Sequence, residues 1–412
     1  MGKVTEIKAC RASGSTELIP ILSLGEQELS GVFPKSKDQK ITRGPLDLVF
    51  CPVSGLVQLK HTYDADEMYS FNYGYRSGLN ASMVAHLQNK VNFIERSVDL
   101  KKGDVVVDIG SNDATTLKSY QVAGIRRIGI DPTGVKFKEY YPQEIELIPD
   151  FFSEAAFKKT DAKKAKVVTS ISMFYDLPAP VQFAQDICSI LDDDGIWHFE
   201  QSYLPSMLRT NSYDTICHEH LEYYSLGSVK YILDLAGFKI LDVSMNSVNG
   251  GSFAVTACKK SNVKLNQNTP LINWMLDFEK RLGLHTVQPY LDFAKRVARI
   301  REDLRTLVDY LNKAGKKVYG YGASTKGNVT MQYCGFTAKD IHAISEVNPE
   351  KFGSFTPATH IPIISEAQSK LDKPDYQIIF PWHFREFILP REKSYMEAGG
   401  KLIFPFPEVE II

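Results

Sequence analysis

Hydrophobic and polar positions divide the chain into stretches with different periodicities. Residues 1 to about 80 carry short apolar runs broken by Ser, Gly and Pro, which is typical of a small β-rich module. From Gly103 onward, strand-sized apolar runs alternate with amphipathic helices, and this alternation predicts a parallel, doubly wound sheet. A long helical stretch then ends near Gly315, where a second and smaller alternation begins. The chain is therefore expected to have an α/β fold with a β-rich N-terminal module and two Rossmann-like domains.

The same pattern sets the expected domain boundaries. We expect the small module over residues 1–78, a first Rossmann-like domain over 79–262, and a helical linker with the second domain over 263–412. Between 79 and 98, apolar residues approximate a helical stripe that leads into the first domain. The runs GFKILDVSMN and SFAVTACKK resemble terminal antiparallel strands, and NQNTPLINW begins the linker.

Composition limits the classes of protein to consider. The chain has 412 residues with 43% hydrophobic residues, and its 48 Lys+Arg nearly balance its 49 Asp+Glu. This is the composition of an ordinary soluble globular protein, and it predicts no surface for nucleic acid. The N-terminus has no secretory signal pattern, and the longest apolar runs are too short to span a bilayer. We expect a cytoplasmic monomer or homodimer with its six scattered cysteines reduced.

Polar residues at two predicted strand ends indicate a nucleoside-containing cofactor. The strand from Val105 ends at Asp108, and Gly110, Asn112 and Asp113 form the turn before a helix. Asp131 ends the next strand, 23 residues after Asp108, where a carboxylate can accept both hydroxyls of a ribose. The loop DIGSNDA lacks the G-x-G-x-x-G of a dinucleotide site, which favours the cationic tail of S-adenosylmethionine over NAD. The alternative is a purely structural strand-to-helix turn.

A third strand end adds two candidates for the same cofactor. Asp150 and Phe151 follow the predicted third strand in IPDFF, where residues that contact adenine are expected. Phe151 or Phe152 can cover a base with its ring. A pair of core phenylalanines beside a solvated aspartate explains the segment equally well, and both interpretations stay open.

The segment TICHEHLEYYS, residues 215–225, is a candidate acid-base cluster. It places His220 next to Glu219 after a predicted strand and loop. Imidazole accepts a proton near neutral pH, and an adjacent carboxylate can orient or polarise it. The HEH order lacks the i, i+4 histidines of a zinc helix, so a catalytic zinc is not expected. A metal-binding or surface patch remains the alternative interpretation.

Two further segments are candidates for substrate contact. Asn249, Gly250 and Gly251 in NGGSF form a glycine turn that can bring backbone close to a ligand, although a simple hairpin explains them as well. Trp382 and His383 in FPWHFREF can stack on a base and hydrogen-bond to it. A buried tryptophan beside a surface histidine is the alternative.

The segment GYGASTKGN, residues 320–328, is a candidate phosphate site. It combines a strand end with Tyr321, the hydroxyls of Ser324 and Thr325, and Lys326 at the start of a helix. Backbone amides and a lysine at a helix N-terminus can hold phosphate. The segment lacks the order G-x-x-x-x-G-K-[ST], so a nucleoside triphosphatase is not expected. A plain strand-to-helix turn is the alternative.

These motifs together resemble the sugar C-methyltransferase family, which makes branched deoxysugars. CRASG, CPVSG, YGYRSG, DIGSNDA, TICHEHLEYYS, NGGSF, GYGASTKGN and GGKLIFPFPEV carry the resemblance over nearly the whole length. It implies a zinc-binding N-terminal module, a class I Rossmann-like domain that binds S-adenosylmethionine, and a C-terminal domain. It also implies a nucleotide-linked 4-keto-6-deoxysugar between the last two domains, methylated at C3 through an enolate. By this resemblance His220 is the base, Glu219 its neighbour, and Tyr75 or Tyr73 the aromatic side chain that reaches the sugar.

The chain departs from the family at two positions near the expected sugar. Cys217 stands where the family often has tyrosine, and Asp176 in MFYDLP replaces an expected histidine. Both positions are still expected to contact substrate. Because of these departures, the sequence does not identify the sugar. It also does not identify the hydrogen-bond donor that stabilises the enolate.

The N-terminal module departs further from the family pattern. The family has C-x-x-C twice, whereas this chain pairs Cys10 with Ser13 and Cys51 with Ser54. Serine is a poor zinc ligand, and two thiolates do not complete a tetrahedral site. We therefore expect no zinc, with compensation by His61 and another side chain as the alternative.

Other functions remain compatible with the motifs. One is methylation at oxygen or nitrogen of a sugar or small metabolite, which needs no keto group. Another is a non-catalytic nucleotide-sugar-binding or scaffold protein, which the missing thiols favour and the intact HEH opposes. An NAD-dependent sugar oxidoreductase is less compatible, because the loop has a single glycine and no Tyr-x-x-x-Lys pair stands in an evident catalytic position.

Overall fold

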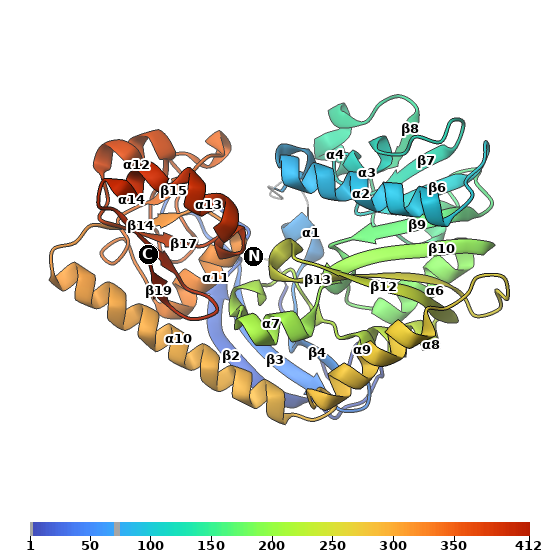
Figure 1. Cartoon of the computed structure of the whole chain (residues 1–412), viewed down its shortest axis with the longest axis horizontal. Helices are drawn as coiled ribbons and strands as arrows, with labels where there is room; N and C mark the ends of the chain where they lie inside the picture. The colour runs from blue at the N-terminus through green and yellow to red at the C-terminus, as the bar shows by residue number, and fades with distance from the viewer. Residues whose placement is uncertain (1–2, 70–74) are drawn as a thin grey trace.

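Each stretch of the predicted pattern supplies most strands of one sheet (Figure 1). The computed structural model describes residues 3–69 and 75–412. Within them, a four-stranded, a seven-stranded and a six-stranded sheet are the main elements, and a two-stranded ribbon joins β1 (Thr5–Glu6) to β5 (His61–Thr62). The predicted α/β class, with a β-rich N-terminal module and two Rossmann-like sheets, is confirmed by the strand order and the parallel pairing. The exact boundaries at 78 and 262 stay predictions.

The N-terminal sheet is antiparallel and receives its fourth strand from a distant part of the chain. Its order is β11 (Glu222–Tyr223), β4 (Leu56–Leu59), β3 (Arg43–Cys51) and β2 (Ile19–Glu28). Leu46, Leu48 and Phe50 alternate along β3 and point into one core, as the two-residue period of a strand requires. The helix α1 (Ala65–Tyr69) follows this sheet. Pairing with β11 ties the module to the segment that contains the predicted catalytic residues.

The middle sheet has the class I Rossmann-like order. In sheet order its strands are β12 (Phe238–Asn246), β13 (Ser252–Lys259), β10 (Leu191–Ser202), β9 (Ala165–Ile171), β6 (Val105–Ile109), β7 (Arg126–Ile130) and β8 (Ile145–Ile148). β13 is antiparallel to both of its neighbours, and the other pairs are parallel. The carboxyl ends of the central strands therefore meet at one edge, where ligands bind in such sheets.

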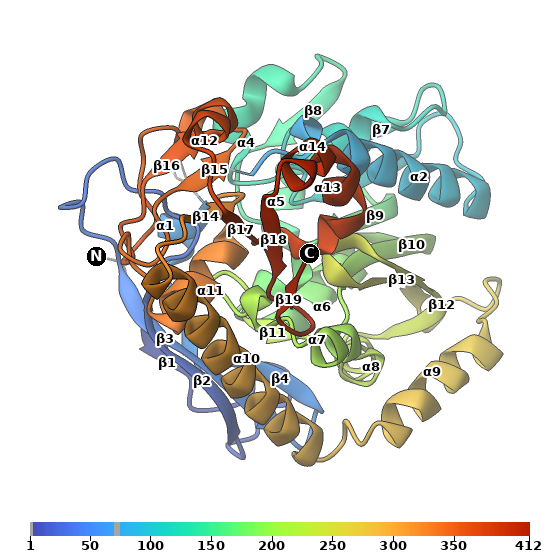
Figure 2. The same ribbon diagram turned by 60° about the vertical axis from the view of Figure 1, so that its left-hand side comes forward.

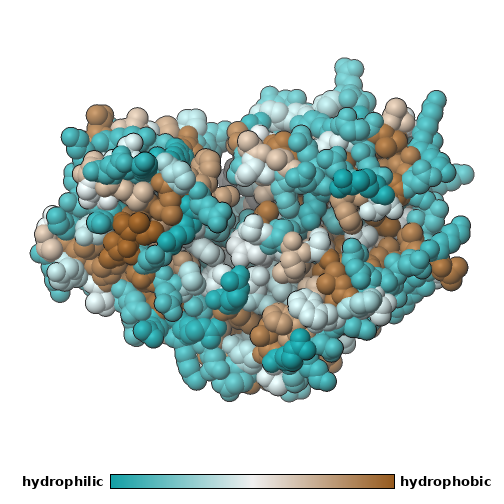
Figure 3. Space-filling model, in the orientation of Figure 1, coloured by the Kyte–Doolittle hydropathy of each residue, from teal (hydrophilic) through white to brown (hydrophobic). Residues whose placement is uncertain are grey.

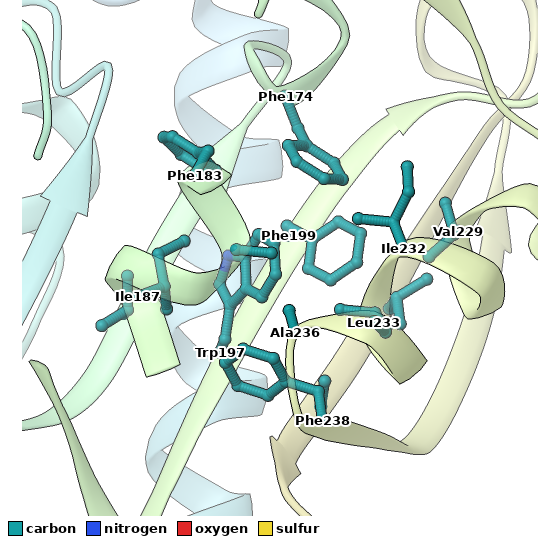
Figure 4. Close-up of a cluster of buried hydrophobic side chains, with 14 of the residues drawn as sticks. Phe174, Phe183, Ile187, Trp197, Phe199, Val229, Ile232, Leu233, Ala236 and Phe238 are labelled. Carbon is teal, nitrogen blue, oxygen red and sulfur yellow. The ribbon is translucent and has the colours of Figure 1, made fainter. Parts of the chain in front are cut away.

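Helices cover both faces of the middle sheet. Val106 of β6 packs with α2 (Ala81–Ser97) on one face, and Val107 packs on the other with α6 (Pro180–Ile190) and α8 (Leu226–Leu235). The second face has an aromatic core, in which the Trp197 and Phe199 ring centroids are 4.3 Å apart and Phe174 lies 5.2 Å from Trp197 (Figure 4). The shorter helices are α3 (Thr115–Lys118), α4 (Gly134–Phe137), α5 (Glu154–Phe157) and α7 (Leu204–Thr210).

Two long helices connect the middle and C-terminal sheets (Figures 1 and 2). α9 (Thr269–Arg281) ends before Gly283, whose φ of 73° favours glycine, and α10 (Gln288–Lys313) follows. The buried stripe of α10 packs on the N-terminal sheet at its start, where the rings of Tyr290 and Phe50 lie 4.9 Å apart. The end of the same stripe packs on the C-terminal sheet. The helix α10 thus packs against both the N-terminal and the C-terminal sheet.

The C-terminal sheet is a smaller Rossmann-like unit. Its order is β16 (Ile363–Ser365), β15 (Ile344–Glu346), β14 (Val318–Tyr321), β17 (Tyr376–Ile379), β18 (Lys401–Phe404) and β19 (Glu410–Ile411). All pairs are parallel except β18 with β19. Its helices are α11 (Thr325–Cys334), α12 (Glu366–Asp372), α13 (Arg385–Arg391) and α14 (Lys393–Glu397).

Hydrophilic side chains cover most of the face shown in Figure 3, with hydrophobic groups in scattered patches. The face is hollowed near its upper edge, between the lobe of the C-terminal sheet and the lobe of the middle sheet. In the part of the chain that the structure describes, no helix has the length and apolar character needed to cross a membrane.

Candidate active site

The loop after β6 forms the first part of the site. Gly110 follows the strand with a φ of 71°. A Cβ atom at Gly110 would lie 3.0 Å from the Cγ atom of Met173, so the close approach of these two segments favours glycine. Asn112 also has a positive φ, 50°, which asparagine adopts more readily than most residues. The chain therefore turns sharply at the carboxyl end of a central strand.

Asp131 lies directly after β7 and closes the same loop. One of its carboxylate oxygens accepts a hydrogen bond from the Asn112 amide at 2.7 Å. The other accepts from the amide and the hydroxyl of Thr133 at 2.7 and 2.6 Å. Burial raises the pKa of Asp131. Gly110, Asn112 and Asp131, which the sequence assigns to one cofactor site, are thus brought together at adjoining strand ends.

The other residues predicted to bind the cofactor differ in their surroundings. Asp108 is buried within β6, where Thr169 donates to its carboxyl at 2.5 Å and burial raises its pKa to about 7. Asp150 pairs with Lys159 at 2.6 Å, which lowers the pKa of Asp150. Phe151 is 43% exposed. The last two lie after β8, as expected, and contacts of all three with a cofactor stay predictions.

A segment that begins at Tyr75 covers the loop after β6. Asn112 Oδ1 and Asp113 Oδ2 accept hydrogen bonds from the backbone amides of residues 77–78, at 2.9 and 3.0 Å. Asn112 Nδ2 donates to the Tyr75 carbonyl oxygen at 3.1 Å. Two side chains predicted to bind the cofactor therefore also hold the chain that enters the middle domain. Tyr75 itself is 46% exposed, and Tyr73 lies outside the described residues.

Residues 215–224, here called the HEH loop, are anchored to the N-terminal sheet. Glu222 in β11 lies opposite Gln58 of β4, and the Leu59 amide donates to the Leu221 carbonyl oxygen at 2.8 Å. The Arg11 Nε atom lies 3.8 Å from the Glu222 carboxylate, and both side chains are almost fully buried. Burial raises the pKa of Glu222, and the charge of Arg11 opposes that rise. The module thus fixes the end of the HEH loop.

His220 in this loop is held in one protonation state. Its Nδ1 atom lies 2.8 Å from the Thr215 carbonyl oxygen, which only accepts hydrogen bonds. Nδ1 therefore carries the proton, and Nε2 keeps its lone pair. Burial lowers the pKa of His220 to about 4, so the ring is neutral at pH 7. The Tyr175 ring packs edge-on at 4.4 Å, and both residues line a small pocket with Tyr203 and Tyr223.

Asp176, Cys217 and Glu219, which the sequence analysis assigns to the site, interact with one another next to His220 in the chain fold. The Cys217 thiol hydrogen-bonds to the Glu219 carboxyl group, and the Tyr69 hydroxyl hydrogen-bonds to Asp176. Burial raises the pKa of all three predicted residues, and the charge of Glu219 raises that of Asp176 further. In the described ranges, one oxygen of Asp176 and one of Glu219 are buried without a hydrogen-bond partner.

The predicted substrate residues of the middle and C-terminal sheets meet next to the HEH loop. Lys326 Nζ donates to the carbonyl oxygen of Asn249 at 3.2 Å. A Cβ atom at Gly250 would lie 3.2 Å from the indole of Trp382, so the glycine turn and this indole are in close contact. Trp382 Nε1 donates to the buried Asp214 carboxylate at 2.8 Å. Segments far apart in sequence therefore contact one another here, and we call this place the Lys326–Trp382 junction.

The remaining predicted residues of the C-terminal sheet lie around α11. Ser324 caps this helix by accepting from a first-turn amide at 3.1 Å, and Thr325 is its first residue. The Tyr321 hydroxyl donates to Glu392 at 3.2 Å, which holds this side chain in the core. Burial lowers the pKa of His383 far below its usual value. The roles of all four in substrate binding stay predictions.

Family models match consecutive parts of this chain. The model described as "Putative zinc binding domain" matches residues 10–69, "Methyltransferase domain" matches 83–243, and "C-methyltransferase C-terminal domain" matches 247–407. The chain is 31% identical to C-methyltransferase NovU of Streptomyces niveus over 416 residues, which cover 99% of this chain and 98% of that protein. The chain belongs to the C-methyltransferase family. It is an S-adenosylmethionine-dependent methyltransferase, and the predicted family and enzyme class are confirmed.

Solved structures of methyltransferases show a low similarity to part of this C-methyltransferase. The mitomycin 7-O-methyltransferase MmcR is 14% identical, with a TM-score of 0.35 over 44% of this chain and 55% of that chain. The CcbJ methyltransferase of Streptomyces caelestis is 9% identical, with a TM-score of 0.33 over 42% of this chain and 89% of that chain.

The N-terminal module of this C-methyltransferase does not fit a zinc ion. Cys10, Ser13, Cys51 and Ser54 hold the positions where the family has thiols. Among residues 3–69 and 75–412, no group of three or more His, Cys, Asp or Glu side chains is arranged to hold a metal. His61 therefore does not join Cys10 and Cys51 in such a group.

Sequence reasoning missed Arg11, Tyr175 and Asp214. Each lies inside or next to a segment that the sequence singled out: CRASG, MFYDLP and TICHEH. That proximity was the available signal. Their partners lie far along the chain, so only the folded structure shows that Arg11 reaches Glu222 or that Trp382 donates to Asp214.

Proposed function

We propose that this C-methyltransferase methylates C3 of a nucleotide-linked 4-keto-6-deoxysugar. The observation that carries the proposal is the neutral His220, which keeps a lone pair on Nε2 and lines a small pocket. A C–H group is a weak acid, so a carbon acceptor needs a base and an activating group. A keto group at C4 supplies the activation, because the electrons left at C3 delocalise onto its oxygen.

His220 is the base in this proposal. Its Nε2 atom removes the C3 proton, and the hydrogen bond from Nδ1 to the Thr215 carbonyl oxygen keeps the ring in the tautomer that can do so. The same bond stabilises the imidazolium that results. Glu219, the neighbour of His220 in the chain, is the carboxyl group that we propose to orient the ring, and burial raises its pKa.

Asp176 is our candidate for the donor to the enolate oxygen. Burial raises its pKa well above the usual value, which favours the neutral acid at neutral pH. A neutral carboxylic acid in an apolar site donates a strong hydrogen bond to an oxyanion. The Cys217 thiol, which stands where the family often has tyrosine, is a weak donor and is already bonded to Glu219.

The loop after β6 is the proposed cofactor site. S-adenosylmethionine supplies an electrophilic methyl group on a sulfonium. Asp131 would accept the ribose hydroxyls, and Asn112 and Asp113 would contact the cationic amino-acid tail. Gly110 permits the close approach of backbone to ligand.

The Lys326–Trp382 junction is the proposed site for the nucleotide part of the substrate. Ser324 and Thr325 begin α11, a helix of 10 residues whose N-terminal amides and dipole favour an anion. Lys326 adds a positive charge beside them. This arrangement suits a diphosphate, and we propose Trp382 and His383 as candidates for contact with a base.

The test compares His220→Asn with the matched control His218→Asn. Asparagine can still donate to the Thr215 carbonyl oxygen but has no basic lone pair. We expect methyl transfer to fall by about 10² to 10⁴, the usual contribution of a general base, with S-adenosylhomocysteine affinity unchanged. His218 packs against Tyr63 at 4.7 Å, outside the pocket, so its variant should retain activity.

Deuterium exchange makes the test specific for carbon chemistry. Wild-type protein with S-adenosylhomocysteine and a nucleotide 4-keto sugar in D₂O should exchange the C3 proton, and His220→Asn should not. Normal turnover by His220→Asn would remove His220 from the role of base. A methyl group found on oxygen or nitrogen, without C3 exchange, would replace the proposal by O- or N-methylation.

A further inference from the structure

Two turns of the N-terminal module have matching conformations. In the first, the Gly14 amide donates to the Cys10 carbonyl oxygen at 2.9 Å, and Gly14 has a φ of 69°. In the second, the Gly55 amide donates to the Cys51 carbonyl oxygen at 2.9 Å, and Gly55 has a φ of 68°. Each turn therefore projects its first and fourth side chains in the same way.

The side chains of the two turns bond to each other in a crossed pattern. The Cys10 Sγ atom lies 3.2 Å from Ser54 Oγ, and the Cys51 Sγ atom lies 3.4 Å from Ser13 Oγ. Both sulfurs are buried in the main core, with exposures of 3% for Cys10 and 0% for Cys51. Four polar side chains from two turns thus converge in one small space.

Zinc bonds cannot account for this convergence. A structural zinc ion takes four ligands, and thiolate or imidazole groups supply nearly all of them. The turns offer two thiols and two hydroxyls, and a serine hydroxyl stays protonated at neutral pH. Hydrogen bonds between thiol and hydroxyl, in contrast, satisfy all four groups without any metal.

We propose that these turns form a metal-free knuckle, in which two thiol–hydroxyl hydrogen bonds replace the bonds to zinc. The backbone keeps the geometry of a four-ligand site, so Ser13→Cys with Ser54→Cys should create a zinc centre at Cys10, Cys51 and the two new thiols. The knuckle does not depend on the proposed sugar chemistry.

The first turn of the knuckle positions the side chain of Arg11. Arg11 lies inside the first turn, and its guanidinium donates to the Leu59 carbonyl oxygen at 2.6 Å and to Thr62 Oγ1 at 2.8 Å. Its Nε atom faces Glu222 of the HEH loop at 3.8 Å. Fixing the first turn therefore fixes the side chain that meets the HEH loop.

Metal analysis of the full-length protein tests the knuckle. After incubation with zinc and exhaustive dialysis, wild type should hold no more zinc than the control Cys10→Ser/Cys51→Ser, whereas Ser13→Cys/Ser54→Cys should hold about one ion per chain. Cobalt(II) in the double cysteine variant should give the absorption of a tetrahedral thiolate site. Stoichiometric zinc in wild type, lost in the control, would overturn the proposal.

Two further variants keep the test decisive if the double cysteine variant does not fold. Ser54→Cys alone supplies a third thiol and should bind zinc above the wild-type level. Ser13→Ala/Ser54→Ala removes both hydroxyls and should lower the midpoint of thermal unfolding without changing metal content. A folded Ser54→Cys protein that binds no zinc, or an alanine variant as stable as wild type, would each contradict the knuckle.

Discussion

Replacing Arg11 with methionine removes a buried cation that links the N-terminal module to the HEH loop. The variant loses the 3.8 Å contact with Glu222 and the hydrogen bonds to the Leu59 and His61 carbonyl oxygens and to Thr62. Methionine has a similar length and fills most of the space. Three part-buried oxygen acceptors lose their donor and Glu222 loses the nearby positive charge that opposes its raised pKa, and breaking such a buried network costs about 3 to 5 kcal/mol.

Hydrogen exchange of the β4 amides measures this cost locally. Each 1.4 kcal/mol corresponds to about a tenfold change in an opening equilibrium, so we expect protection to fall by about 10² to 10³ or more. Arg11→Met/Glu222→Leu should lose less protection than Arg11→Met, since no carboxyl group is left unpaired. His220 shares the HEH loop with Glu222, so methyl transfer should fall while S-adenosylhomocysteine binding persists. A loss of protection below about tenfold would refute the reasoning.

Further perturbations have defined outcomes. Asp131→Asn should weaken S-adenosylhomocysteine binding by about 1.5 to 3 kcal/mol in calorimetry, and unchanged affinity would contradict the ribose contact. Trp382→Phe leaves the buried Asp214 without its indole donor and should cost about 1 to 3 kcal/mol in urea unfolding, so unchanged stability would contradict that bond. Burial lowers the pKa of His218 to about 4, so its neutral form stabilises the fold above pH 6.5 and this contribution is lost as pH falls toward 4. The free energy of unfolding of wild type should therefore fall by about 2 kcal/mol more than that of His218→Asn when the pH is lowered from about 7.5 to about 5. Urea unfolding at both pH values measures this difference, and an equal fall in both proteins would refute it.

Local patterns were sufficient to predict the two Rossmann-like sheets. The run ending at Asp108 and the run ending at Asp131 became neighbouring parallel strands because alternating strands and helices allow few other arrangements. Gly110 was also recognisable from the sequence, because a sharp turn after a strand needs a residue that adopts positive φ. These features depend on residues close together in sequence.

Contacts between distant segments were beyond such reasoning. Nothing in LEYYS alone shows that Glu222 forms a strand with β4 or meets Arg11, because pairing partners of a short strand depend on the whole fold. Every residue type other than proline has a backbone amide, so the sequence could not show that the amides of residues 77–78 donate hydrogen bonds to the side chains of Asn112 and Asp113. Tyr175 was overlooked beside Asp176, since only the folded chain places its ring against His220.

Transfer of a labelled methyl group tests the central claim most directly. The protein is incubated with S-adenosylmethionine carrying a ¹³C methyl group and a panel of nucleoside-diphosphate-linked 4-keto-6-deoxysugars, and the product is examined by mass spectrometry and NMR. The account predicts a product heavier by one labelled methylene, with the ¹³C methyl group bonded to C3 and the C3 proton lost or exchanged. A labelled methyl group on oxygen or nitrogen, or no transfer to any keto sugar while S-adenosylhomocysteine binds, would contradict it.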